Sequence, residues 1–261
     1  MYAVVLAGGR GTRLYPVVQD RPKPMAPVGN KCFLEIVVAM MKQNGLTEFI
    51  FCVCHMAEKI IDYFGDGGKF GVKISYSVES EPLGTGGAIG LLRNVIDDAF
   101  CVLNGDTYQE LDVRRLIAQH RTKGGIATMT LVKTDNASRY GQVVTDQDGY
   151  VIKFGEKDPG RLLDGEHGPD GLSGLINAGI YVWEPAVFKY IPPRQFSSLE
   201  KDILPAVLKA NEKIYTYSCV QNFIDIGIPS DYARFVRRET GSRADREPSP
   251  RPICTTGDLD G

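Results

Sequence analysis

A short apolar run that ends in glycines sets the strongest limit on how this chain folds. Residues 2–7 read YAVVLA, and Gly8 and Gly9 follow directly. Six apolar residues bounded by glycine are typical of a strand that is buried on both faces. Such strands occur in parallel sheets whose two faces are covered by helices. The N-terminal segment therefore predicts the first strand of an α/β domain.

The rest of the first half repeats this pattern. Apolar strand-like runs alternate with segments of helical periodicity, in the order strand 2–7, helix 33–44, strand 49–54, helix 56–64, strand 72–78, helix 86–96 and strand 100–103. This alternation predicts a mainly parallel sheet in a Rossmann-like, three-layer α/β/α fold. Ligands bind such sheets outside the carboxyl ends of the strands. We therefore expect the loop after the first strand and Asn104-Gly105-Asp106 after the fourth to share one edge.

The second half is richer in strands, so that the sheet is expected to be mixed. The predicted elements are strands at 126–133, 142–154 with a turn at Asp148-Gly149, 176–183 and 213–219, and helices at 197–210 and 229–239. A polar, glycine-rich loop covers 158–172. We expect one domain over residues 1–240, with halves at about 1–110 and 111–240. Residues 241–261 carry no apolar periodicity and are predicted to be a disordered tail.

Charge and cysteine content exclude several classes of function. Lys and Arg number 30 and Asp and Glu 32, which gives a net charge of −2 and no general attraction for nucleic acid. No segment has the length and apolarity of a membrane helix or a signal peptide, so that no membrane partner and a cytoplasmic location are expected. The six cysteines form no CxxC pair and there are three histidines, which argues against zinc.

A cationic glycine loop follows the first strand. The sequence Gly8-Gly9-Arg10-Gly11-Thr12-Arg13 places backbone N–H groups and two arginines together, and Lys23 follows between two prolines. Such a loop suits phosphate, because glycines let a ligand approach the backbone closely. The spacing matches neither a P-loop nor a dinucleotide fingerprint. The alternative is a surface turn with solvated arginines, but the nearby Lys23 favours a polyanion site.

Two aspartates stand next to glycines after apolar segments. Asp106 lies in LNGDT, and Asp225 lies in FIDIG. Magnesium in proteins is commonly held by one or two carboxylates together with phosphate oxygens. Either aspartate alone could equally form an Asx-turn or a cap. Together with the cationic loop, the pair predicts a Mg²⁺ site.

An acidic segment follows the third strand. Glu79 and Glu81 precede the glycine-rich run Leu83-Gly84-Thr85-Gly86-Gly87. A carboxylate accepts hydrogen bonds from two adjacent donors, and among the nucleobases guanine offers such a pair in its N1–H and 2-amino groups. The alternative is a solvated acidic loop. The segment therefore makes Glu79 and Glu81 candidates for recognition of guanine.

The ordered motifs GGRGTRL, RPKPMAPV, ESEPLGTGGAI, LNGDT, NAGIY and FIDIGIPSDY resemble the sugar-1-phosphate nucleotidyltransferase family over about residues 1–236. Within it, the chain is most similar to the bacterial D-glycero-D-manno-heptose 1-phosphate guanylyltransferases, with mannose-1-phosphate guanylyltransferases next. The resemblance implies a glycosyltransferase-A-like fold and transfer of a nucleotidyl group, GMP from GTP first, to a sugar 1-phosphate. Use of UTP, dTTP or ATP is left open, as is the oligomeric state, for which a homodimer is one option.

The resemblance also implies roles for individual residues. Arg13, Lys23 and Asp106 would be catalytic, and Asp106 and Asp225 would hold Mg²⁺. The residues expected to bind the nucleotide are Leu6, Ala7, Gly8, Gly9, Gly11, Thr12, Arg13, Lys23, Glu79, Gly84, Thr85, Asn104 and Gly105. Those expected to bind the sugar phosphate are Gly141, Glu156, Lys157 and Asn177. Family members often read Glu-Lys-Pro where this chain has Asp158 before Pro159.

Two other classes of protein share parts of this pattern. A metal-dependent glycosyltransferase would also pair a nucleotide-binding sheet with an aspartate, but it would not need the cationic loop at a pyrophosphate end. A non-catalytic regulatory relative would be expected to have lost Arg13, Lys23 or Asp106, and this chain keeps all three.

Overall fold

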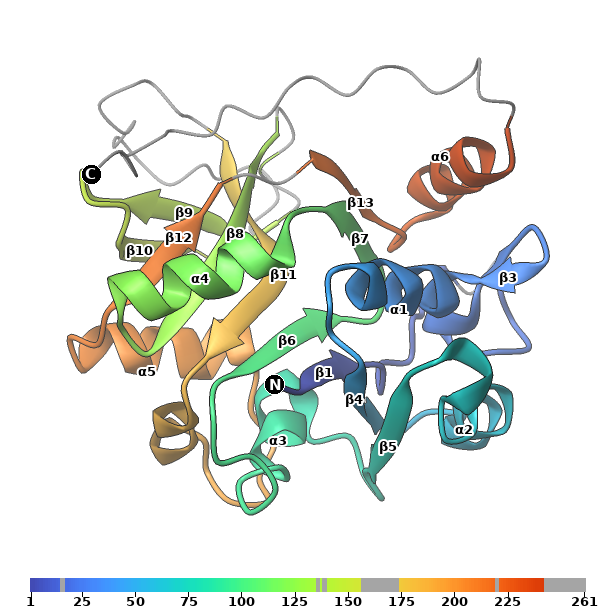
Figure 1. Ribbon diagram of the computed structural model, residues 1–261, viewed down its shortest axis with the longest axis horizontal. Helices are drawn as coiled ribbons and strands as arrows, with labels where there is room; N and C mark the ends of the chain where they lie inside the picture. Colours follow the sequence, from blue (N-terminus) through green and yellow to red (C-terminus); the bar gives the residue numbers. More distant parts are fainter. Residues whose placement is uncertain (15–16, 135–136, 138–139, 156–173, 219–220, 242–261) are drawn as a thin grey trace.

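A single nine-stranded sheet forms the core of the fold (Figure 1). The computed structural model describes residues 1–14, 17–134, 137, 140–155, 174–218 and 221–241. The strands of the sheet are β1 (Ala3–Leu6), β4 (Glu48–Val53), β5 (Lys73–Val78), β6 (Phe100–Asn104), β8 (Ala127–Lys133), β9 (Gln142–Thr145), β10 (Val151–Gly155), β11 (Leu175–Trp183) and β12 (Ile214–Tyr217). Their order is β10-β9-β11-β6-β1-β4-β5, and β8 pairs with β11 and β12.

The parallel part of the sheet is the one that the apolar runs predict. Strand β1 pairs in parallel with β4 on one side and with β6 on the other, and β4 pairs in parallel with β5. Leu6 lies opposite Asn104 in this register. The carboxyl ends of β1 and β6 therefore meet at one edge, as expected.

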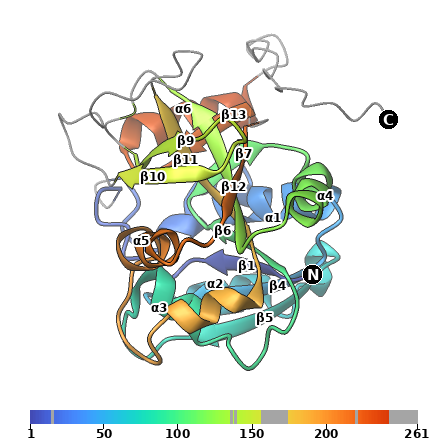
Figure 2. The ribbon, with the colours of Figure 1, turned by 90° about the vertical axis from the view of Figure 1, so that its left-hand side faces the viewer.

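Helices cover both faces of this sheet, which confirms the three-layer α/β/α fold. Ala3 and Val5 pack with residues of α1 (Phe33–Gln43), α2 (Ala57–Phe64), α4 (Val113–Lys123) and α6 (Pro229–Thr240). Val4 points to the opposite face, because side chains alternate along a strand. It packs with residues of α3 (Gly84–Gly90) and α5 (Leu204–Lys209). Figure 2 shows α3 and α5 together in a view turned by 90°.

The second half extends the sheet with antiparallel strands. Strand β11 pairs antiparallel with both β6 and β8, and β9 pairs antiparallel with β10. The sheet is therefore mixed, as expected. A register shift in β11 lies between Asn177 and Tyr181, and Gly179 within it has φ +81°. A Cβ there would stand 2.7 Å from Asn104 Nδ2, so that glycine makes room for Asn104 at the sheet edge.

Some predicted boundaries differ from the structure. The helix expected over 86–96 is α3, which ends at Gly90. The helix expected over 197–210 begins as a π-helical turn, Leu199–Ile203, and continues as α5. The sequence patterns did not predict α4, whose first turn is capped by Asp112, nor the paired strands β7 (Thr107–Glu110) and β13 (Gln221–Asp225). Residues 242–261 and the whole of the predicted 158–172 loop lie outside the described residues.

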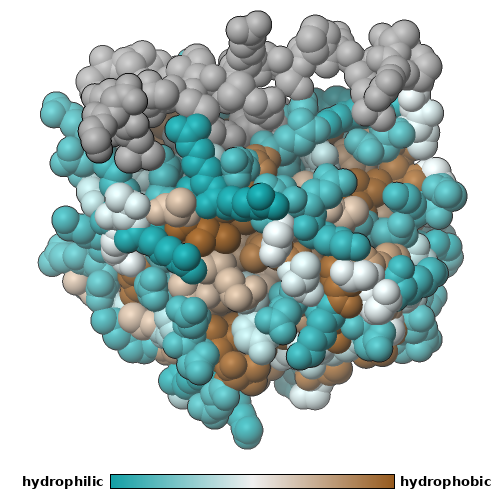
Figure 3. Space-filling view, viewed as in Figure 1, coloured by the Kyte–Doolittle hydropathy of each residue, from teal (hydrophilic) through white to brown (hydrophobic). Residues whose placement is uncertain are grey.

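The surface of the molecule is mainly polar. Polar residues cover most of the face in Figure 3, and apolar residues gather near its centre. Within the described residues, none of the helices combines the length and the apolarity that crossing a bilayer requires.

Candidate active site

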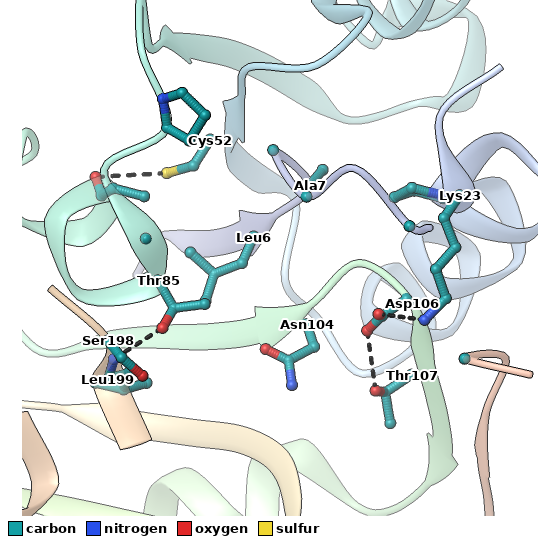
Figure 4. Close-up of a pocket in the computed structure, with 18 of the residues that line it drawn as sticks. Leu6, Ala7, Lys23, Cys52, Thr85, Asn104, Asp106, Thr107, Ser198 and Leu199 are labelled. Atoms are coloured by element: carbon teal, nitrogen blue, oxygen red, sulfur yellow. Dashed lines mark hydrogen bonds and ion pairs between the residues drawn. The ribbon is translucent and has the colours of Figure 1, made fainter. Parts of the chain in front are cut away.

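A cavity of about 500 Å³ opens at the carboxyl edge of the parallel strands. All the residues predicted to bind the nucleotide line it except Gly105, and Asp106 and Asp225 line it too. Gly105 lies directly behind the wall, where its N–H donates to the Leu6 carbonyl at 2.9 Å. Figure 4 shows Leu6, Thr85 and Asn104 on one side of this space and Lys23 with Asp106 on the other. The fold thus gathers residues from distant parts of the sequence into one space.

The glycines in the loop after β1 pack closely against side chains that line the cavity. Gly11 has φ +59°, and a Cβ on it would stand 2.7 Å from the Cβ of Lys23. A Cβ on Gly8 would stand 3.2 Å from Glu79 Oε1. Glycine at these positions therefore lets Lys23 and Glu79 reach the cavity. Thr12 and Arg13 are exposed and line it, which leaves a cationic side chain available to an anionic ligand.

Lys23 joins the two aspartates at the centre of the cavity wall. Its Nζ lies 2.6 Å from Asp106 Oδ2 and 3.4 Å from Asp225 Oδ1. The strands β7 and β13 bring the aspartates together, because Thr107 lies opposite Asp225 in their antiparallel register. Further hydrogen bonds orient the carboxylates, from the Thr107 hydroxyl to Asp106 and from the Gly227 N–H to Asp225. The result is a buried cation between two oriented anions.

The electrostatics of this cluster keep Lys23 charged. Its side chain is 8% exposed, whereas those of Asp106 and Asp225 are 36% and 14% exposed. Burial lowers the pKa of Lys23, but attraction by Asp106 and Asp225 more than offsets burial, and the net shift of the pKa is upward. The cluster therefore carries two carboxylates and one ammonium, a net charge of −1.

The donor set of this cluster suits a divalent cation that is shared with phosphate. No group of three or more His, Cys, Asp or Glu side chains suited to a metal occurs among the described residues, so that these residues alone do not form a complete metal cage. Two carboxylates in a cavity rimmed by a cationic loop are what Mg²⁺ needs when phosphate oxygens supply further ligands. The present residues therefore fit such an ion.

Glu79 lines the same cavity. Its side chain is buried, and its Oε2 accepts a hydrogen bond of 2.9 Å from the N–H of Leu83. Burial raises the pKa of Glu79, and the Leu83 hydrogen bond opposes that shift in part. Glu81 is exposed and is not among the described residues that line the cavity. The structure thus distinguishes the two glutamates that the sequence could not separate.

The residues predicted to bind the sugar phosphate differ most from the expectation. Asn177 is buried and does not line the cavity as described, but its Nδ2 donates to Tyr181 Oη and, at 3.1 Å, to Glu200 Oε1. Tyr181 and Glu200 do line the cavity. Gly141 lies behind them, accepting from the Asn177 N–H at 2.9 Å. The predicted Glu156 and Lys157 lie outside the described residues.

Several cavity residues were missed from the sequence. They are Pro24, Cys52, Pro82, Ala88, Thr107, Tyr181, Phe196, Ser198, Leu199, Glu200 and Gly227. Tyr181 belongs to the NAGIY motif and Gly227 to FIDIGIP, so that the motifs themselves were a usable signal. Phe196 and the residues from Ser198 to Glu200 carried no such signal, because Phe196 precedes the helix predicted over 197–210 and the other three were interpreted only as its start.

Sequence comparison finds relatives of this chain over most of its length. The model of the nucleotidyl transferase family matches residues 2–240. The chain is 37% identical over 239 residues to the D-glycero-alpha-D-manno-heptose 1-phosphate guanylyltransferase of Campylobacter jejuni. This alignment covers 90% of this chain and 99% of that protein. The chain is 36% identical over 251 residues to the UTP–glucose-1-phosphate uridylyltransferase of Synechocystis, which covers 91% of this chain, although the chain spans 63% of that protein.

Structure comparison agrees with the sequence. The crystal structure of HddC from Yersinia pseudotuberculosis complexed with GMP-PN matches with a TM-score of 0.75 and 34% identity, covering 91% of this chain and 98% of that one. The arrangement of strands and helices is therefore that of solved members of this group. A family match over residues 2–240, together with a relative that is 37% identical and aligned over 99% of its length, shows that the chain belongs to the nucleotidyl transferase family.

Proposed function

We propose that this protein transfers the GMP group of GTP to a sugar 1-phosphate and releases pyrophosphate, with Mg²⁺ as the cofactor. The observation that carries the proposal is the single cavity that joins the cationic loop, the Lys23–Asp106–Asp225 cluster and the buried Glu79. D-glycero-α-D-manno-heptose 1-phosphate is the first candidate acceptor, because the Campylobacter relative named for it matches over almost its whole length. Mannose 1-phosphate is the second.

The proposed reaction requires stabilisation of negative charge rather than a general base. A sugar 1-phosphate is already anionic at neutral pH, so that its oxygen can attack the α-phosphorus without losing a proton. The barrier comes from repulsion between two anions and from charge that builds up on the departing pyrophosphate. Arg13, Lys23 and the glycine-loop amides line the space where that charge would lie. Asp106 and Asp225 are the residues that would hold Mg²⁺, which would supply further neutralising charge.

The test of the proposal is a matrix of acceptors and donors scored by pyrophosphate release. Heptose, mannose and glucose 1-phosphates are each combined with GTP, UTP, dTTP and ATP. The proposal expects the largest kcat/KM for GTP with a manno-configured acceptor. Release of a nucleoside diphosphate from a nucleotide sugar, without pyrophosphate, would instead support a glycosyltransferase.

A uridylyltransferase is the second candidate function. The Synechocystis relative carries that name at 36% identity. The buried carboxylate of Glu79 favours guanine, because the N1–H and 2-amino groups are donors that can replace the water lost on burial. Uracil would place a carbonyl oxygen toward that carboxylate, which is an active penalty.

Substitution of Glu79 tests this choice. Glu79→Gln is expected to lower the ratio of kcat/KM for GTP over UTP by about tenfold or more, because charge-assisted hydrogen bonds are lost. The measurement is steady-state kinetics with both nucleotides at a fixed acceptor concentration.

Glu81→Gln is the matched control for this substitution. Glu81 is exposed on the same loop, and its variant should keep the wild-type ratio. A wild-type ratio in Glu79→Gln would show that backbone groups at Leu6, Ala7 and Gly84 select the base instead.

Arg13 offers a test of where the cationic loop acts. Because the transition state carries more charge than the bound substrate, Arg13→Ala should lower kcat by about 10²-fold. The KM for nucleotide should change much less. The measurement is kcat and KM for GTP, with Arg10→Ala as the control, because Arg10 lies in the same loop but is not among the described cavity residues. An effect confined to KM would contradict this role.

A further inference from the structure

Phe196 is the most exposed large apolar side chain among the described residues, and it lines the candidate active site. Its side chain is 69% exposed, although a phenylalanine is normally buried. The next most exposed is Val78, at 56%. An aromatic face left open at the wall of a ligand cavity is a feature that the chemistry proposed above does not use.

The backbone that presents Phe196 is firmly held. The N–H of Ser197 donates to the Leu83 carbonyl at 2.9 Å, and the Ser197 carbonyl accepts from the N–H groups of Gly86 and Gly87 at 2.8 and 3.2 Å. The N–H of Leu199 donates to Thr85 Oγ1 at 2.8 Å, which Figure 4 shows as a dashed line. The exposure of Phe196 therefore does not come from a loosely attached loop.

The glycines of the GTGG run are explained by the same contact. A Cβ on Gly84 would stand 2.5 Å from the Ser197 carbonyl oxygen and 3.1 Å from Phe196 Cε2. A Cβ on Gly87 would stand 2.7 Å from the Gln195 carbonyl oxygen. Any larger residue would push the segment that carries Phe196 away from α3. These glycines thus bring the ring against the wall of the cavity.

Hydrogen bonds through Leu83 connect the segment that carries Phe196 to the carboxylate that we assign to the base. Leu83 donates its N–H to Glu79 and accepts at its carbonyl from Ser197, so that one residue links Glu79 to the neighbour of Phe196. Pro82 and Gly84, on either side of Leu83, line the cavity as Phe196 does. An edge-recognising carboxylate and an open aromatic face therefore lie at the same end of the site.

We propose that Phe196 stacks on the face of the nucleobase while Glu79 binds its edge. The inference rests on the proposed nucleotidyl transfer and adds a second contact to the nucleotide. Stacking needs only a π-face, so Phe196 contributes affinity for any base, and most for a purine, whereas Glu79 contributes the choice among bases. The phosphates and the sugar 1-phosphate do not take part in this contact.

The first test compares ligands with and without a base. Phe196→Ala is expected to raise the Kd for GTP and for guanosine by about 5- to 150-fold, the range that base–aromatic stacking supports. Its Kd for inorganic tripolyphosphate should stay unchanged, and Phe196→Tyr should bind GTP as the wild type does. Ile152→Ala is the control, because Ile152 is 54% exposed on β10 and does not line the cavity.

The second test measures the contact by the fluorescence of an indole placed at position 196. The chain has one tryptophan, Trp183, which is completely buried. In Phe196→Trp, a second and exposed indole should lose fluorescence when GTP is added, because a stacked guanine quenches it, and should not respond to tripolyphosphate. Quenching by the sugar 1-phosphate alone would overturn the proposal by placing the ring at the acceptor.

The outcomes separate this inference from the proposed function. Wild-type affinity for GTP and guanosine in Phe196→Ala, with an active wild-type enzyme, would overturn the stacking contact and leave the proposed function intact. Failure of the wild-type protein to bind any nucleoside triphosphate would overturn both.

Discussion

Asp106→Asn is expected to lower kcat by about 10²–10³-fold or more, while the protein stays folded. Asparagine keeps the shape of the side chain but removes the negative charge that faces Lys23 and, in our proposal, Mg²⁺. Asp106 is 36% exposed, so that water can solvate the new amide and the melting temperature should change little. The measurements are single-turnover kinetics over a range of Mg²⁺ concentrations and thermal unfolding.

Direct metal binding gives this prediction a second readout. Mn²⁺ binding in the presence of nucleotide, followed by electron paramagnetic resonance, should weaken in Asp106→Asn and in Asp225→Asn. Asp97→Asn is the matched control, because Asp97 is exposed ahead of β6 and does not line the cavity. Near-normal turnover of Asp106→Asn at low Mg²⁺ would rule out Asp106 as a metal ligand.

Lys23→Met is expected to impair both catalysis and stability. The variant keeps the length of the side chain and removes the cation that lies 2.6 Å from Asp106 and 3.4 Å from Asp225. Turnover should fall by about 10²–10³-fold, because charge on the transferred phosphates loses a preorganised partner. The free energy of unfolding should fall by about 1–3 kcal/mol, toward the lower end because the aspartates are partly exposed.

Divalent metal should distinguish the two effects of this variant. Two adjacent carboxylates without a cation should gain more from Mg²⁺, so that the ion should raise the melting temperature of Lys23→Met more than that of the wild type. Lys31→Met serves as the control, since the exposed Lys31 pairs with the partly buried Glu35 at 3.8 Å, and neither residue lines the cavity. An equal rise in melting temperature with Mg²⁺ in Lys23→Met and the wild type would contradict the proposal that the ammonium and the metal interact with the same two carboxylates.

The local pattern of the sequence was sufficient for the parallel core. Runs such as YAVVLA are short, apolar and bounded by glycine, which identifies buried strands without knowledge of their partners. The carboxyl-edge rule then brought the glycine loop and Asn104 together, and the register of β1 with β6 confirms it. Helix α6, which begins at Pro229, was predicted at its correct position because proline favours the first turn of a helix.

Short and irregular elements were harder to predict. Strand β7 has four residues, TYQE, and it pairs with β13 more than a hundred positions away in the sequence. A local pattern therefore predicts neither the strand nor its pairing. The helix expected to reach residue 96 stops at Gly90. The roles proposed for Asp106, Asp225 and Glu79 stay predictions until the experiments above are done.

By itself, the sequence determined the α/β class, the edge of the sheet expected to bind ligands and the set of charged residues expected there. Buried strands and glycine-rich turns can be recognised from short stretches of sequence. The tertiary structure decided which of these residues meet. It placed Lys23 between Asp106 and Asp225, buried Glu79 and left Glu81 exposed, and turned Asn177 toward Tyr181 and Glu200. It also set Phe196 against Gly84. Each of these contacts depends on the packing of segments that are far apart in the sequence. Periodicity along the chain does not indicate which of these segments lie close together in space.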